Sequence, residues 1–243
     1  MFQINTDFRR IPPYSITMLS AFLLGIGLLY LLNRRDGIPK RIAGYLALLN
    51  PVMIVCNASG LTYLSSHGRS LGFSSLGALF GMYGSVIVMS LICGKRDAAR
   101  TMLENCTLVL PLMYGVSKFG CFLAGCCRGF AYAGTFCVTY TGAKTGTVSA
   151  FPVQLLESLS FLLLFGIGML LRKRHRSAAV FVIFFLSAAA KGLLDFLRAE
   201  HQGKLLSLNQ ILCVVLIVLG AAVLVLRVQQ KTGKNRIKKR AAS

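Results

Sequence analysis

The sequence predicts an all-α integral membrane protein with seven transmembrane helices, on the evidence of its composition, its apolar stretches and its charge distribution. Of the 243 residues, 55% are hydrophobic and only 14% are charged, a balance that excludes a water-soluble globular domain. The 27 Lys and Arg residues outnumber 7 acidic residues, giving a net charge of +20. They stand in short runs between apolar stretches, which favours membrane orientation over binding to nucleic acid.

Seven stretches are long enough to cross a hydrocarbon core, which takes about 20 apolar residues in a helix. The predicted spans are 15–32, 42–64, 73–93, 103–122, 153–171, 178–197 and 205–226. Asn33, Arg34 and Arg35 follow the first span without a small-residue cleavage site, so we expect a retained helix rather than a signal peptide. Residues 1–227 are interpreted as one membrane domain and residues 228–243 as a basic cytoplasmic tail.

The loops between these spans differ in charge on the two sides of the membrane. With seven spans, 18 of the 27 Lys and Arg residues fall on the side of the C-terminus, and nine fall on the other. Because basic residues favour the cytoplasmic side, we expect an external N-terminus and a cytoplasmic C-terminus. One span more or fewer would move the later loops to the other side of the membrane and abolish this asymmetry. The charge distribution therefore also supports seven spans.

The end of the fourth span carries the first polar residues of a candidate site. Lys118, Cys121 and Arg128 are spaced so that they share one side if the helix continues. Four glycines nearby, among them Gly129, permit close approach of a neighbouring backbone or a ligand. Ionisable residues near membrane depth are functional candidates because their burial is costly, although a helix-packing ion pair or a snorkelling anchor explains a single one equally well.

The fifth and sixth spans add charged residues at the same predicted face. Gln154 and Glu157 share a helix face, and Lys191, Asp195 and Arg198 stand at i, i+4 and i+7. Asp195 can neutralise only one cation, so a positive charge remains to bind a phosphate or a carboxylate. The alternatives are a structural carboxylate at Glu157 and a membrane-interface anchor on the sixth span.

Four of the eight cysteines gather in the predicted external region, namely Cys121, Cys126, Cys127 and Cys137. They lack C-x-x-C spacing and a nearby histidine, so we expect no metal and no cofactor. A disulfide on an oxidising external face and free buried thiols both stay open.

Four segments resemble the prolipoprotein diacylglyceryl transferases, a family of seven-span enzymes of the bacterial plasma membrane. The family signature Gly-Arg-x-Gly-Asn-Phe corresponds to residues 117–122, and the form GCFLAGCC looks like a variant branch. The family segment His-Pro-x-Gln-Leu-Tyr-Glu is matched by Pro152, Gln154 and Glu157. The family face Arg-x-x-x-Glu-x-x-Arg corresponds to Lys191, Asp195 and Arg198, and the family segment Ser-x-x-Gln is kept as Ser207 and Gln210.

This resemblance implies the transfer of a diacylglyceryl group from phosphatidylglycerol to the thiol of a lipobox cysteine in a preprolipoprotein, with release of glycerol phosphate. It implies a catalytic set of Lys191, Asp195, Arg198 and Glu157. It implies a substrate-binding set of Lys118, Cys121, Gly129, Arg128, Gln154 and Gln210.

One segment departs from the family pattern. Where the family has Ser-Phe-His-Gly-Gly, this chain has residues 70–74 with Gly72 in place of the histidine, and His67 lies five residues earlier. The alternative functions are therefore a non-catalytic relative that binds anionic lipid or lipoprotein, and thiol redox chemistry at Cys121, Cys126 and Cys127. A transporter is disfavoured because the spans lack midplane charges.

Overall fold

The described part of the chain contains seven long helices, as the sequence predicts. The computed structural model describes residues 2–6, 13–69, 72–94, 96–142, 146–201 and 205–241. Its helices are α1 (Pro13–Arg35), α2 (Lys40–Ser65), α3 (Ser75–Cys93), α4 (Arg96–Ala124), α5 (Val153–Arg174), α6 (Arg176–Asp195) and α7 (Leu208–Ala241). The short elements are the strands β1 (Phe2–Asn5), β2 (Val138–Gly142) and β3 (Gly146–Ala150), and the 3-10 helix η1 (Ala199–His201). Each long helix contains an apolar stretch long enough to span a membrane.

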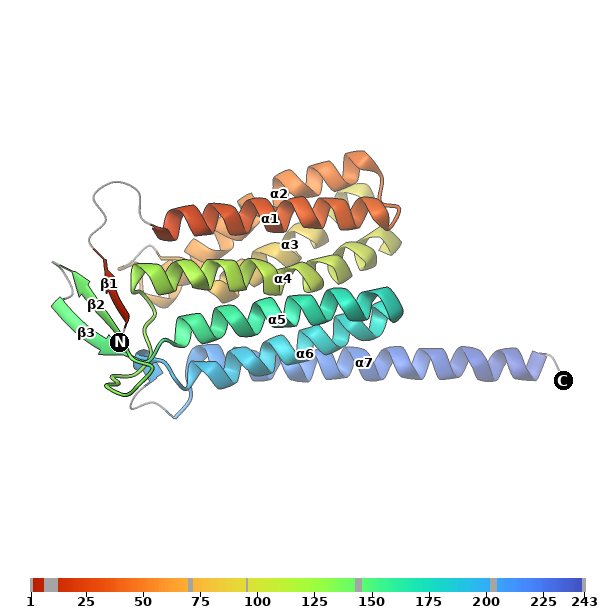
Figure 1. Ribbon diagram of the computed structural model, residues 1–243. Helices are drawn as coiled ribbons and strands as arrows, with labels where there is room; N and C mark the ends of the chain where they lie inside the picture. The colour runs from red at the N-terminus through yellow and green to blue at the C-terminus, as the bar shows by residue number, and fades with distance from the viewer. Residues whose placement is uncertain are drawn as a thin grey trace.

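The helices lie side by side in one bundle, with the sheet at one end and the C-terminal half of α7 extending beyond the other (Figure 1). Helix α4 is central, because it packs against α1, α3, α5 and α6. Half of its membrane-spanning stretch is buried, compared with 11% for α7. The two termini lie at opposite ends of the bundle, as an odd number of spans requires.

The observed helix ends differ from the predicted ones where a helix continues past its apolar stretch. Helix α4 begins at Arg96 rather than residue 103, and α7 runs to Ala241, through the segment assigned to a basic tail. A helix can continue past its apolar stretch because its backbone hydrogen bonds are made within the helix itself. Helix α6 ends at Asp195, two residues before the predicted end.

A three-stranded sheet with the order β1-β2-β3 adds to the helical bundle and was not predicted. Strand β1 pairs in parallel with β2, with Phe2 opposite Val138, and β2 pairs antiparallel with β3, with Val138 opposite Ala150. These strands have four or five residues each, with hydroxyl and glycine residues among the apolar ones, so they give little periodic signal. The sheet lies at the end of the bundle where α4 ends and α5 begins.

Helices α2 and α3 approach closely because α3 carries two glycines on the face toward α2. A Cβ added to Gly77 would stand 2.4 Å from the Asn57 carbonyl oxygen, and one added to Gly81 would stand 2.3 Å from that of Met53. Small residues one turn apart allow this contact between membrane helices, which associate through close packing rather than through the hydrophobic effect.

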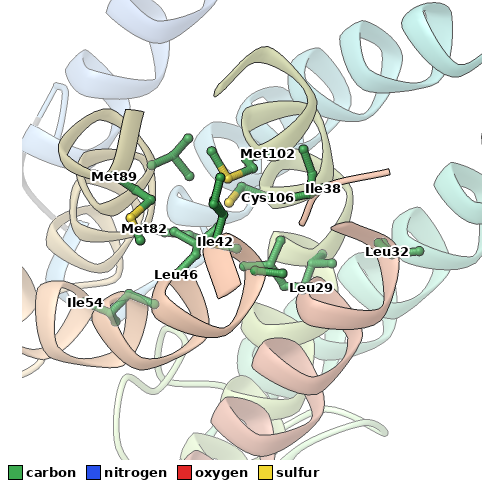
Figure 2. Packing of buried hydrophobic residues seen from close by; sticks show 13 residues of the cluster. Leu29, Leu32, Ile38, Ile42, Leu46, Ile54, Met82, Met89, Met102 and Cys106 are labelled. Carbon is green, nitrogen blue, oxygen red and sulfur yellow. The ribbon is translucent and has the colours of Figure 1, made fainter. Parts of the chain in front are cut away.

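Buried apolar side chains from α1, α2, α3 and α4 fill the space between these helices. Figure 2 shows Leu29, Leu46, Met82 and Met102 pointing toward one another from the four helices. The outer surface is also apolar, since large side chains on every span are exposed. Such a surface suits contact with lipid and would be a liability in water.

A second polar cluster joins the helix ends that lie opposite the sheet. Asp36 accepts hydrogen bonds from Arg172 Nη2 at 2.8 Å and from Asn105 Nδ2 at 2.8 Å, and pairs with Arg176 Nη1 at 3.0 Å. Arg176 also pairs with Glu104, 3.0 Å away. The cluster therefore ties α4, α5 and α6 to the end of α1.

We expect Asp36→Asn to lower the thermal stability, because it leaves two arginines facing less negative charge in a mostly buried place. Removing one partner of a buried pair costs about 3–5 kcal/mol, and partial exposure reduces this to about 2 kcal/mol. The midpoint of thermal unfolding in detergent should fall by about 5 °C or more. Arg100→Ala is the control, since the Arg100 side chain is 58% exposed, and it should shift the midpoint by no more than about 1 °C.

Candidate active site

The last three turns of α4 present a tyrosine, a lysine and a cysteine on one face. Tyr114, Lys118 and Cys121 follow a spacing of four and three residues, so they lie above one another along the helix. Gly115 lets α5 approach this part of α4, because an added Cβ would stand 3.1 Å from the Ser158 carbonyl oxygen. The Ser158 hydroxyl donates a hydrogen bond to the Gly115 carbonyl at 2.8 Å, which fixes the two helices in register.

Helix α5 begins directly after β3 and turns two polar residues inward in its first turns. Pro152 precedes the first helical residue, a position where its missing N–H costs nothing. Gln154 and Glu157 are fully buried, so the shared face predicted for them is confirmed. Gln154 donates from Nε2 to the Cys126 carbonyl at 2.8 Å and thus anchors the loop after α4.

Glu157 is the centre of a cluster of three cations. Its carboxylate accepts two hydrogen bonds from Arg198 Nη2, at 2.8 and 2.9 Å. Lys191 Nζ lies 3.2 Å from one carboxylate oxygen, and Lys118 Nζ lies 3.3 Å from the other. A buried carboxylate with this many partners is fixed in place, and it fixes α4, α5 and the end of α6 relative to one another.

Asp195 is the second carboxylate of the cluster. It lies 3.9 Å from Lys191 Nζ and 3.5 Å from Arg198 Nε, which confirms that these three residues lie together. Helix α6 ends at Asp195, and Arg198 stays beside it because Leu197 and Arg198 donate backbone hydrogen bonds in a tighter turn. Three cations face two carboxylates within this group, so one positive charge is left over, as the sequence predicts.

Tyr114 belongs to this cluster and was missed at the level of sequence. Its hydroxyl donates to Glu157 at 3.1 Å, and the Nζ atoms of Lys118 and Lys191 each lie 5.3 Å from the centre of its ring. Cation–π attraction of this kind holds an ammonium group over a ring face. The signal in the sequence was its position one turn before Lys118.

The Ser-x-x-Gln segment forms a capping box at the start of α7. The Gln210 backbone N–H donates to Ser207 Oγ at 3.1 Å, and the Ser207 N–H donates to Gln210 Oε1 at 2.9 Å. The Ser207 hydroxyl also donates to Asp195, so the cap holds this carboxylate. The Gln210 side chain therefore caps the start of α7, and its Nε2 donates a hydrogen bond to the Gly192 carbonyl at 3.3 Å.

The helical pattern proposed for Lys118, Cys121 and Arg128 is wrong for Arg128, because α4 ends at Ala124 and the chain turns at Gly125. Residues around Gly129 instead pair with the segment after α6: Gly129 forms an antiparallel bridge with Arg198, and Ala199 donates to the Arg128 carbonyl at 3.1 Å. Arg128 and Gly129 thus hold the Arg198 backbone.

Gly129→Ala should destabilise this pairing. An added Cβ would stand 2.4 Å from the Phe151 carbonyl oxygen and 3.1 Å from that of Leu197, and backbone atoms cannot rotate away. Overpacking of this kind costs about 1–3 kcal/mol, so we expect a thermal midpoint lower by about 3–10 °C. Gly27→Ala in α1 is the matched control, because an added Cβ there meets nothing within 4 Å. An unchanged midpoint for Gly129→Ala would contradict the tight pairing.

Three cysteines meet where α4 ends. Gly125 takes a left-handed conformation with φ of 66°, the Cys126 N–H donates to the Cys121 carbonyl, and the Gly125 N–H donates to that of Phe122. This Schellman motif folds Cys126 back over Cys121. Cys127, with φ of 53°, turns the chain again, and the three Sγ atoms lie within 4.8 Å of one another. Cys137 lies apart at the beginning of the sheet.

The pKa values of Cys126 and Cys127 are shifted in opposite directions. Hydrogen bonding to Cys121 and to Cys127 raises the pKa of Cys126, and burial adds to this effect. Hydrogen bonds from Cys121 and Cys126 lower the pKa of Cys127, and the charges of Lys118 and Arg198 lower it further. A thiolate is therefore stabilised at Cys127 by its two neighbours and by the nearby cations.

A cavity of about 560 Å³ between the helices joins these groups. Its polar end is lined by Lys118, Cys121, Cys126, Cys127, Lys191 and Arg198, and its apolar walls include Phe22, Ile54, Met82, Leu110, Phe161 and Leu216. Glu157 is buried beneath the three cations and is absent from the described lining, so it positions them rather than facing the cavity.

The segment that departs from the family pattern is only partly described. Ser70 and Leu71 lie outside the described residues. His67 is exposed in the turn after α2, and among the described residues that line the cavity there is no histidine.

The fold and the site together define a multi-pass membrane protein in which buried cations and three neighbouring thiols line a largely apolar cavity. A family model described as prolipoprotein diacylglyceryl transferase matches residues 1–226. The chain belongs to the prolipoprotein diacylglyceryl transferase family.

Two bacterial relatives are similar over part of the chain. The phosphatidylglycerol–prolipoprotein diacylglyceryl transferase of Clostridium tetani is 30% identical over 158 residues, which cover 61% of each chain. The phosphatidylglycerol–prolipoprotein diacylglyceryl transferase 2 of Clostridium perfringens is 26% identical over 167 residues, covering 62% of this chain and 63% of the relative. The chain thus spans a little over three fifths of the length of these relatives.

Proposed function

We propose that this protein transfers a diacylglyceryl group from phosphatidylglycerol to the cysteine thiol of a prolipoprotein at the external face of a bacterial plasma membrane. The observation that carries the proposal is a cavity with apolar walls and a cationic end. The walls suit acyl chains, and the positive charge left over among Lys118, Lys191, Arg198 and the two carboxylates suits a phosphodiester.

The same arrangement favours the reaction as well as the binding. When the bond between glycerol carbon and phosphate oxygen breaks, negative charge grows on the leaving phosphate. Cations already fixed by Glu157 and Asp195 stabilise this charge without reorganisation, which is the most effective form of electrostatic catalysis. Lys118, Lys191 and Arg198 line the cavity and are assigned to the phosphate.

The orientation in this proposal depends on the basic residues. The C-terminal end of α7 and the ends opposite the sheet carry most of them, so this side is assigned to the cytoplasm. The sheet, the cysteines and the cation cluster then belong to the external side, where a lipoprotein precursor presents its lipobox. The GCFLAGCC sequence is interpreted as a variant branch of the family.

Rescue of a bacterium depleted of its own transferase tests this function. Expression of the wild-type chain should restore growth and lipoprotein modification, and Lys191→Ala should not. Normal membrane levels of both proteins are the control. A wild-type chain present at normal level that restores no lipoprotein modification would overturn the proposal.

A second candidate is a non-catalytic relative that binds anionic lipid, and the replacement of the family histidine by Gly72 favours it. In that case labelled phosphatidylglycerol should bind the purified protein and lose affinity in Arg198→Ala, while no glycerol phosphate is released. Release of glycerol phosphate by the wild-type protein excludes this candidate.

A further inference from the structure

The turn that ends α4 brings the thiols of Cys121, Cys126 and Cys127 close together. Their Sγ atoms lie within 4.8 Å of one another, and all three are free. Cys127 adopts a left-handed backbone conformation, which costs about 1–2 kcal/mol for a residue with a side chain. The Schellman motif, the Gln154 hydrogen bond to the Cys126 carbonyl and this strained residue together bring the thiols to one point.

Three convergent thiolates are a ligand set for a thiophilic cation such as Zn²⁺. Zinc–sulfur bonds of about 2.3 Å in a tetrahedron place sulfurs about 3.8 Å apart, a separation compatible with three Sγ atoms that lie within 4.8 Å of one another. Three protein ligands leave the fourth position open, as in zinc sites that act on a substrate rather than stabilise a fold. Cys126 is exposed and Cys127 partly so, which leaves a path for the cation to enter.

The surrounding charges suit such a site. Three thiolates and a divalent cation have a net charge of −1, and Lys118 and Arg198 line the same end of the cavity. The nearby positive charges of Lys118 and Arg198 would lower the cost of burying this negative group. A buried metal–thiolate group is stable where its charge is compensated by fixed neighbours.

The proposed reaction also needs a way to deprotonate the acceptor thiol, and the described lining of the cavity offers no histidine for this. A thiol that coordinates a divalent cation loses its proton and stays nucleophilic. Cys121, Cys126 and Cys127 line the same cavity in which the phosphate is assigned to Lys118 and Arg198, so a cation bound to them would be within reach of both substrates.

We propose that Cys121, Cys126 and Cys127 bind a thiophilic cation such as Zn²⁺, whose open position takes up the acceptor cysteine as its thiolate. This inference rests on the proposed function. The acceptor thiol releases its proton to solvent as its sulfur coordinates. The sulfur then attacks the glycerol carbon, the carbon–oxygen bond breaks, and glycerol phosphate leaves with the electron pair and takes up a proton. Nothing is oxidised or reduced.

The first experiment measures metal binding without reference to activity. Reduced full-length protein in detergent is titrated with Co²⁺, which reports tetrahedral thiolate ligation by its visible absorption bands. We expect one equivalent per chain, displaced by Zn²⁺. Cys121→Ser and Cys127→Ser should weaken binding by more than about tenfold. Cys56→Ser and Cys137→Ser, which alter an exposed and a buried thiol outside the cluster, should not.

The second experiment adds a lipobox peptide to the Co²⁺ protein. A peptide with the acceptor cysteine should change the absorption bands, whereas the same peptide with serine should not. Absence of a Co²⁺–thiolate band in reduced protein overturns the inference, even if the protein lipidates. Absorption bands that do not change when the cysteine peptide is added would exclude coordination of the acceptor thiol by the cation.

Failure of the proposed function gives a different result. A change in the absorption bands that depends on the peptide cysteine, together with no lipidation, would support the metal site and exclude the transferase activity.

Discussion

Arg198→Ala is expected to lower kcat/KM for lipidation of a lipobox peptide by a factor of about 10²–10³. Arg198 lines the cavity, and its guanidinium is held by two hydrogen bonds to Glu157 and by Asp195. Its charge is therefore fixed where negative charge develops on the leaving phosphate. Initial rates over a range of phosphatidylglycerol concentrations measure the effect.

Arg198→Lys should recover part of this loss, because a lysine keeps the charge and loses the planar fork of donors. Arg69→Ala is the control for removing a positive charge, since Arg69 is exposed in the turn after α2. An Arg198→Ala protein with normal kcat/KM would remove the phosphate role from this cluster.

Glu157→Gln is expected to have the largest combined effect on stability and activity. The substitution keeps the shape but removes the charge that pairs with Lys118, Lys191 and Arg198, all of which are buried. Breaking such a pair costs about 3–5 kcal/mol, so the thermal midpoint should fall by about 10 °C. The rate should also fall, because cations that repel one another leave their fixed positions.

Glu157→Asp separates these two effects. It keeps the charge on a shorter side chain, so stability should largely recover while kcat stays low. A merely structural role for Glu157 predicts the opposite, with kcat recovering in step with the thermal midpoint.

The spans could be predicted because a membrane sets a minimum length and excludes charge, and both are visible in one stretch of sequence. The ends of the helices could not be predicted in the same way, since α4 begins at Arg96, on residues that lie outside any apolar pattern. The sheet was missed because its strands are short and its β1–β2 pairing joins residues more than a hundred positions apart.

The candidate site was predicted where its residues are close in the sequence. The spacing of Lys191, Asp195 and Arg198 indicated that they lie together, whereas the pairing of Glu157 with Lys118 depends on how α4 packs on α5. Tyr114 was missed because its position one turn before Lys118 was not used, and a tyrosine in an apolar span carries no other distinctive pattern. Gln154 and Gln210 were predicted as substrate contacts, and the structure places them in hydrogen bonds to backbone groups.

The cysteine cluster could not be predicted from sequence spacing. The expectation of no metal relied on the absence of C-x-x-C and of a nearby histidine, and it stays a prediction that the Co²⁺ titration tests. Here a helix-ending turn brings Cys126 over Cys121, five residues apart, and a left-handed residue brings Cys127 beside them. A glycine just after the helix end, at Gly125, was the signal for this turn.

The measurement that tests the account most directly is lipidation by the purified protein. The protein is reconstituted with phosphatidylglycerol and incubated with a lipobox peptide, and both the peptide mass and free glycerol phosphate are followed. The cysteine peptide should gain one diacylglyceryl group while an equal amount of glycerol phosphate appears. A peptide of unchanged mass and no glycerol phosphate, under conditions where a known transferase modifies the same peptide, would contradict it.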